Sequence, residues 1–169
     1  MPMVETISKF SYGTNVIGSF RKILSSWKPE DLDDHRRNVP KTEKGWERSL
    51  TGHMRLMLPD FNVLQQGGQG MKRGDILVER KSLLGGIVRD VVELKLGLAT
   101  TAAYQRLVGQ VDDYRKETGA TIVVICGEDV DPKLMKTLET RYPSDASKLG
   151  IFWKKSERRG VQQVYPRVT

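Results

Sequence analysis

The chain has 169 residues, of which 38% are hydrophobic and 29% are charged. These values are typical of one globular domain with a buried core, and they exclude a disordered chain or a pair of large domains. One cysteine and two histidines are too few for a disulfide scaffold or a structural zinc site. Lysine and arginine outnumber aspartate and glutamate by 28 to 21, and the net charge of +7 favours either a polyanionic partner such as nucleic acid or a solubilising surface.

Neither a membrane span nor a signal peptide is visible in the sequence. No apolar run is long enough to cross a bilayer, and the N-terminus lacks a charged start followed by an apolar stretch. We therefore expect a cytoplasmic protein that does not contact a membrane.

Residues 1–40 are expected to form a helical extension of a single domain at residues 41–169. Apolar side chains recur at helical spacing over residues 16–27, which predicts a helix whose apolar face needs a partner. Pro29, a run of acidic residues and then basic residues lead to Pro40, and they indicate a polar connection.

The domain at residues 41–169 is predicted to contain both helices and strands. Thr42 is a suitable N-cap for a helix that Pro59 ends, and short runs rich in β-branched residues predict strands. The predicted helices are 42–58, 100–118 and 132–141, and the predicted strands are 61–66, 74–80, 87–96, 121–126, 150–155 and 161–165. The first two strands and the last two are expected to form hairpins. From residue 42 to residue 126 the order is helix, three strands, helix and strand, which predicts an α/β sandwich.

Three of the charged residues on the second and third predicted strands, Asp75, Glu93 and Lys95, point to a chemical function. Glu93 and Lys95 are two positions apart, so their side chains point to the same face, while Asp90 points to the opposite face. If the two strands are neighbours, Asp75 meets Glu93 across them, and two such carboxylates repel unless a cation joins them. Mg²⁺ suits this position because it takes oxygen ligands, keeps several waters and completes its shell with phosphate oxygens; Mn²⁺ is a substitute. With Lys95 to hold an attacking water or to stabilise charge on a phosphate, the residues predict phosphodiester hydrolysis.

This arrangement resembles the motif of the PD-(D/E)XK nuclease superfamily, which includes restriction endonucleases, archaeal Holliday-junction resolvases and RecB-type nucleases. The motif is an aspartate, a variable gap and Glu-X-Lys; here Glu93-Leu94-Lys95 follows Asp75 by 18 positions, with Gly74 in place of the usual proline. Two features beyond the motif extend the likeness, which covers residues 42–126. They are Gln110 and Tyr114, which match a Gln-x-x-x-Tyr helix motif, and Glu47, which matches a glutamate on the preceding helix.

The resemblance implies a restriction-endonuclease-like αβββαβ core, with a mixed central sheet flanked by helices, and a Mg²⁺-dependent deoxyribonuclease. Asp75 and Glu93 would hold the metal, with Glu47 as a further ligand or outer-shell partner, and Lys95 would orient the attacking water. Gln110 and Tyr114 on the following helix would support the site or contact the phosphate. No DNA-reading module is visible, so we expect DNA recognised by its structure or ends rather than by its sequence. A homodimer is left open.

Each of these residues also has a purely structural interpretation. Glu47 could form an ion pair with Arg48, Arg80 or a lysine, and Gln110 and Tyr114 could be ordinary helix packing. Asp75, Glu93 and Lys95 could instead form ordinary ion pairs at the surface. Two other functions also stay open: a nucleic-acid-binding or assembly module that keeps the fold without turnover, and a nuclease directed at RNA.

Basic residues are concentrated in two predicted loops, one beside the glycine-rich segment 67–73 and one around the C-terminal hairpin. Such loops could flank a duplex and hold its phosphates without reading bases, although solvated turn residues are the alternative. These residues are Lys72, Arg73, Lys154, Lys155, Arg158 and Arg159.

Overall fold

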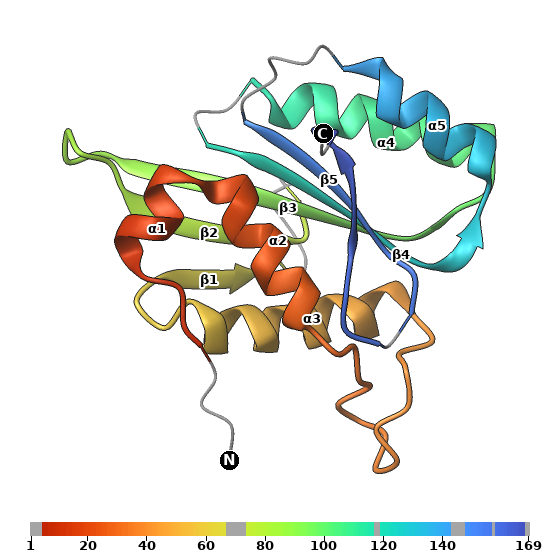
Figure 1. Ribbon diagram of the computed structural model, residues 1–169, viewed down its shortest axis with the longest axis horizontal. Coiled ribbons are helices and arrows are strands. Elements are labelled where there is room, and N and C mark those ends of the chain that lie inside the picture. The colour runs from red at the N-terminus through yellow and green to blue at the C-terminus, as the bar shows by residue number, and fades with distance from the viewer. Residues whose placement is uncertain (1–4, 67–73, 117–118, 143–147, 157, 168–169) are drawn as a thin grey trace.

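The computed structural model describes residues 5–66, 74–116, 119–142, 148–156 and 158–167. Within them, one six-stranded sheet is covered by helices on both faces (Figure 1). The helices are α1 (Lys9–Thr14), α2 (Val16–Ser26), α3 (Glu43–Met57), α4 (Thr101–Tyr114) and α5 (Pro132–Arg141). The strands are β1 (Asn62–Gln65), β2 (Ile76–Lys81), β3 (Ile87–Leu98), β4 (Thr121–Val130), β5 (Leu149–Lys154) and β6 (Gln162–Tyr165).

The strands lie in the sheet in the order in which they occur along the chain. β1, β2 and β3 are antiparallel neighbours, β3, β4 and β5 are parallel, and β6 returns antiparallel to β5. The two parallel steps are made through α4 and α5, because a parallel pair needs a crossover connection. The mixed α/β class, the two hairpins and the order from α3 to β4 agree with the sequence prediction.

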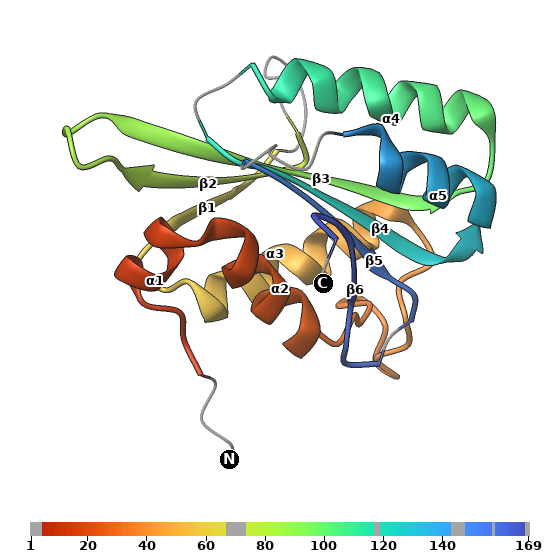
Figure 2. The same cartoon turned by 45° about the horizontal axis from the view of Figure 1, so that its top comes forward.

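The two faces of the sheet carry separate hydrophobic clusters, with α1, α2 and α3 on one side and α4 and α5 on the other (Figure 2). Val92 and Leu94 of β3 belong to the cluster on the first side, and Val123 and Ile125 of β4 to the cluster on the second. The apolar face of α2 finds its partner here, since Phe20, with the rest of that face, is buried in the first cluster. The N-terminal helices therefore share a core with the sheet.

Local signals explain most of the element boundaries. The Thr42 side chain accepts a hydrogen bond from the backbone N–H of Gly45, as expected of an N-cap, and the helix ends before Pro59. β3 and β4 run beyond the predicted residues 96 and 126, and α4 stops at Tyr114 instead of residue 118. The extended part of β3 contains an irregularity at Gly97, whose φ of +82° favours glycine. No helix of the described residues is long and apolar enough to cross a membrane.

Candidate active site

Glu93 and Lys95 lie on the face of the sheet that α4 covers, and Asp75 lies close enough for both of their charges to act on its pKa. The backbone N–H of Asp75 donates to the carbonyl oxygen of Val92 at 2.9 Å, which sets the start of β2 beside the middle of β3. Lys95 Nζ lies 2.7 Å from Glu93 Oε1, so the predicted common face of these two side chains is confirmed. Glu93 is 2% exposed, and its charge is therefore held almost entirely inside the protein.

Tyr114 connects the strand of Glu93 with the turn before Asp75. Its hydroxyl donates to Glu93 Oε2 at 2.9 Å and accepts from the backbone N–H of Gly74 at 3.1 Å. Gly74 has a φ of +81°, and a Cβ there would collide with the Val91 side chain, so only glycine fits this turn without rearrangement. Burial and the Glu93 carboxylate raise the pKa of Tyr114 above its ordinary value, which keeps the hydroxyl a donor.

Asp75 lies in a surrounding that disfavours its negative charge. Burial raises the pKa of its carboxyl group to about 7, and the charges of Glu93 and Glu47 add to this rise. A hydrogen bond from the backbone N–H of Leu94 to Asp75 Oδ2, 2.7 Å long, and the Lys95 charge act in the opposite direction without cancelling it. The site therefore contains more acidic than basic groups, which is a condition that a bound cation relieves.

Glu47 projects from α3, on the other side of the sheet, and is 4% exposed. Gln65 Nε2 donates to Glu47 Oε1 at 3.0 Å, and Lys44 Nζ lies 3.8 Å from the same oxygen. Of the ion pairs considered for this residue, the one with a lysine is present, whereas Arg48 pairs with Asp33 and Arg80 pairs with Asp90. Glu47 thus has its own partners, although its charge still acts on Asp75.

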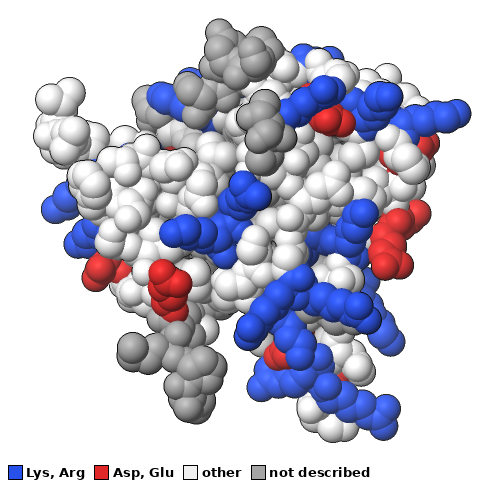
Figure 3. All heavy atoms as spheres, viewed as in Figure 1, with Lys and Arg blue, Asp and Glu red and all other residues white. Residues whose placement is uncertain are grey.

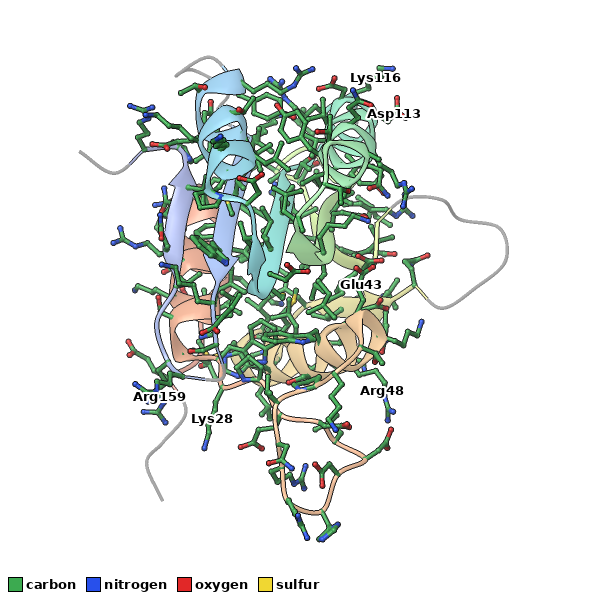
Figure 4. All side chains as sticks on the ribbon, turned by 90° about the vertical axis from the view of Figure 1, so that its right-hand side faces the viewer. Lys28, Glu43, Arg48, Asp113, Lys116 and Arg159 are labelled. Carbon is green, nitrogen blue, oxygen red and sulfur yellow. The ribbon has the colours of Figure 1, made fainter. Side chains whose placement is uncertain are left out.

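Glu43 is a residue of this region that the sequence reasoning missed. Its Oε2 accepts a hydrogen bond from the backbone N–H of Leu96 at 3.0 Å, directly beside Lys95 on β3. Figure 4 shows Glu43 rising from α3 toward the strands. The signal that could have found it is its position one helical turn before Glu47, which places both side chains on one face of α3.

Gln110 lies one helical turn before Tyr114 on α4, but the structure gives it a different environment. Its Oε1 atom is buried without a hydrogen-bond partner among the described residues.

In the described part of the chain, no group of three or more aspartate, glutamate, histidine or cysteine side chains is arranged so that it could hold a metal ion. The expected metal set of Asp75, Glu93 and Glu47 is therefore not such a group, and the first two are linked by the effect of the Glu93 charge on the pKa of Asp75.

The basic residues of the C-terminal hairpin do not behave alike. Lys154 is fully buried and donates from Nζ to the carbonyl oxygens of Leu24 and Gly160, both at 2.9 Å, so the expectation that it contacts phosphates at the surface is wrong. Burial lowers its pKa to about 8. Lys155 is exposed and lies over the Trp153 ring.

Arg158 and Arg159 are exposed in the β5–β6 connection. In Figure 3, lysine and arginine side chains gather at the lower right of the face, over the segment after α2 and this connection. Arg159 and Lys28 lie far from Glu43 in Figure 4, on another side of the molecule. These cations are therefore remote from the carboxylate pair. Lys72 and Arg73 lie outside the described residues.

Comparison with known proteins supplies no function for this chain. No protein-family model matches it, and no curated protein matches it in sequence. A functional proposal therefore depends on the arrangement of Asp75, Glu93 and Lys95.

Proposed function

We propose that this protein is a Mg²⁺-dependent nuclease that hydrolyses phosphodiester bonds, with DNA as the substrate. The observation that carries the proposal is a carboxylate pair, Asp75 and Glu93, with one ammonium group, Lys95, 2.7 Å from Glu93. The element order supports a restriction-endonuclease-like core, because an aspartate precedes the second strand of a three-stranded meander and Glu-X-Lys lies on the third.

The donor set fits Mg²⁺ in the way this ion is commonly bound. One or two carboxylates usually hold Mg²⁺ together with waters and substrate phosphate oxygens, so Asp75 and Glu93 are sufficient without Glu47. Burial and the two nearby glutamates raise the pKa of Asp75, so a bound cation would favour its charged form. When bound, the ion would supply a Lewis acid and a water of lowered pKa.

The residues around the pair have separate parts in this proposal. Lys95 stabilises the negative charge that develops on the phosphate, and this interaction grows as the transition state forms. Tyr114 fixes the orientation of Glu93 through its hydroxyl hydrogen bond. Glu43 holds the backbone of β3 at Leu96 and so keeps Lys95 in place, and Glu47 acts on Asp75 through its charge.

Contacts with nucleic acid are divided between two regions in this proposal. Lys72 and Arg73 directly precede Gly74 and Asp75 in the sequence, so they are the basic residues closest along the chain to the carboxylate pair. Arg159 lies on another part of the surface (Figure 4), and with the exposed Lys155 and Arg158 of the same connection it would contact phosphates away from the site of cleavage.

Incubation of the purified protein with labelled nucleic acids tests the proposal. The substrates are linear duplex, single-stranded, flapped and four-way-junction DNA with matched RNA duplexes, each with Mg²⁺, Mn²⁺, Ca²⁺ or EDTA. We expect cleavage of DNA with Mg²⁺ or Mn²⁺ and none with EDTA, and the Glu93→Gln protein purified in the same way controls for contaminating nucleases. Cleavage of RNA alone would assign the site to an RNA-directed nuclease.

Binding of DNA without cleavage under any of these conditions would contradict the proposal. That result would favour a nucleic-acid-binding or assembly module with the same fold.

A further inference from the structure

The β2–β3 hairpin carries two leucines that nothing in the described structure covers. Leu83 and Leu84 lie at its tip and are 106% and 99% exposed, as in an extended peptide. Figures 1 and 2 show the hairpin extending well beyond the helices on both faces of the sheet, and Figure 3 shows an uncharged projection at the same place. Single exposed leucines are common on protein surfaces, but two adjacent ones on a projecting tip suggest a contact.

The tip is held in a defined shape by short hydrogen bonds. Ser82 N–H donates to the carbonyl oxygen of Gly86 at 2.7 Å, and its Oγ accepts from the N–H of Gly86 at 3.1 Å. Below the tip, the Arg80 side chain of β2 donates to Asp90 of β3, which Tyr12 of α1 also contacts. The leucines are therefore held away from the body of the protein by a braced hairpin.

One face of this hairpin is exposed near the tip, whereas Val91, the next residue on that face toward Glu93, is buried in a cluster with Tyr114. Because side chains alternate along a strand, Ile87 and Arg89 point to the same face as Glu93. Ile87 is 57% exposed, the Arg89 side chain is exposed beside Glu79, and Lys81 pairs with Ile87 at the end of the ladder. Figure 2 shows that α4 ends before this part of the hairpin, and the outer part of the face, at Ile87 and Arg89, is exposed.

The length of this face corresponds to a short stretch of duplex. Six residues of strand separate Ile87 from Glu93, which is about 20 Å at roughly 3.3 Å per residue. About six base pairs of duplex span the same length at roughly 3.4 Å each. A duplex with its scissile phosphate near Glu93 would therefore bring a base step about six base pairs away to Ile87, where the turn that carries the two leucines begins.

We propose that Leu83 and Leu84 form an apolar wedge that enters a base step of duplex DNA bound over the exposed outer part of the β2–β3 hairpin. The proposal rests on the proposed function, and it names the substrate class as duplex whose stacking is already weak, such as a branch point. Apolar side chains inserted between base pairs unstack them, and this costs least where stacking is interrupted. Lys81 on this face, where Arg89 is paired with Glu79, and the net charge of +7 favour a polyanion over other partners.

The test measures unstacking and affinity with 2-aminopurine DNA in buffer with Ca²⁺. The probe is a four-way junction labelled at the branch point, with a linear duplex labelled at a series of steps. Wild-type protein is compared with the double variant Leu83→Ser, Leu84→Ser, and with Leu56→Ser, which removes an exposed leucine of α3. We expect the junction fluorescence to rise with wild type and Leu56→Ser only, and the double variant to bind the junction about tenfold more weakly.

Cleavage with Mg²⁺ is measured separately on the same preparations, so the two proposals can fail independently. If the bound wild-type protein causes no fluorescence rise, or the double variant causes an equal rise, the wedge is overturned even if cleavage occurs. If unstacking depends on the leucines and no cleavage is seen, the wedge stands and the nuclease assignment fails. The double variant is also tested for binding to phosphatidylserine vesicles and for self-association. If it loses either one and its junction fluorescence equals that of wild type, the tip contacts a lipid surface or a second copy of the chain, and the wedge is overturned.

Discussion

Strand β3 carries two buried carboxylates, three residues apart, that face opposite sides of the sheet. Asp90 is 0% exposed and Glu93 is 2% exposed, so burial alone does not distinguish them. Their partners do. The number of positive charges and donors around each one separates a structural carboxylate from a candidate functional one.

Asp90 is fully compensated by groups from three parts of the chain. Arg80 Nε and the Tyr12 hydroxyl each donate to Oδ2 at 2.9 Å, and the backbone N–H of Ala120 donates to Oδ1 at 2.8 Å. One guanidinium group therefore matches one carboxylate, with two neutral donors in addition. Asp90 fastens α1, β2 and the start of β4 together, and no further cation is needed.

Glu93 belongs to a group that is short of positive charge. Lys95 and Tyr114 each contact one of its oxygens, but Asp75 lies close enough for the two carboxylates to repel. Glu47 adds a third negative charge to the field at Asp75. The same strand thus places a closed structural cluster on one face and an uncompensated acidic cluster on the other, and the second is the one that can take a cation.

The largest expected effect is the loss of cleavage in Glu93→Gln. The amide keeps the size of the side chain and can still accept from Tyr114, but it removes a charged oxygen ligand, so the rate with Mg²⁺ should fall by about a thousandfold or more. Single-turnover cleavage of the best substrate measures this. Asp113→Asn is the matched control, because Asp113 pairs with Lys116 at the surface (Figure 4). A rate near that of wild type would remove Glu93 from the site.

Asp90→Asn should lower the stability of the fold and leave the cleavage rate unchanged. Removing one partner of a buried pair leaves the Arg80 charge uncompensated, which costs about 3–5 kcal/mol of unfolding free energy. Thermal unfolding measured by circular dichroism should show a Tm about 10 °C lower. The rate per folded molecule should stay near that of wild type below the transition. A large loss of rate in well-folded protein would mean that the two clusters are not separate in function.

Much of the fold was predictable because its signals are local. The start of α3 follows from the Thr42 cap, and α5 has its predicted bounds because Asp131 and Pro132 mark its beginning. α1 was not predicted, since six residues capped by Ser8 carry no periodic apolar stripe. The added length of β3 and β4 was missed because it comes from their pairing with each other, from Leu96 and Cys126 onward to Leu98 and Val130.

The candidate site was predictable where geometry depends on spacing and not where it depends on distant contacts. The common face of Glu93 and Lys95 follows from strand alternation alone. The Glu43 contact joins residues 53 positions apart, and the burial of Lys154 depends on the carbonyl oxygen of Leu24, 130 positions away. Such contacts exist only once the helices have packed on the sheet.

Lys95→Ala should reduce turnover by about a hundredfold while it changes DNA affinity little, because its contribution is greatest in the transition state. Lys95→Arg should restore only part of the rate, since a planar guanidinium replaces a compact ammonium group 2.7 Å from Glu93. Single-turnover rates at saturating DNA, together with binding in Ca²⁺, separate the two effects. Weaker binding at an unchanged saturated rate would instead make Lys95 a phosphate contact.

The smallest expected effect is a pH-dependent gain of stability in Asp75→Asn. The folded-state pKa of Asp75 is raised from the ordinary value of 3.8 to about 7, so the folded protein holds this proton more tightly than the unfolded chain. The stability from that proton is fully present below pH 4 and is lost as the pH rises to about 7. The amide avoids this loss and can still accept from the backbone N–H of Leu94, so its Tm should exceed that of wild type by about 3 °C at pH 8 and by little at pH 4.5.

Differential scanning fluorimetry at several pH values, with and without Mg²⁺, measures this difference directly. Mg²⁺ at pH 8 should raise the Tm of wild type by mass action and that of Asp75→Asn much less, which removes or reverses the gain. Glu139→Gln, which removes a surface partner of Arg167, is the control and should follow wild type at each pH. An equal difference between wild type and Asp75→Asn at pH 4.5 and pH 8 would mean that Asp75 does not titrate in this range. The carboxylate pair would then be compensated in the way Asp90 is, and the contrast between the two faces of β3 would disappear.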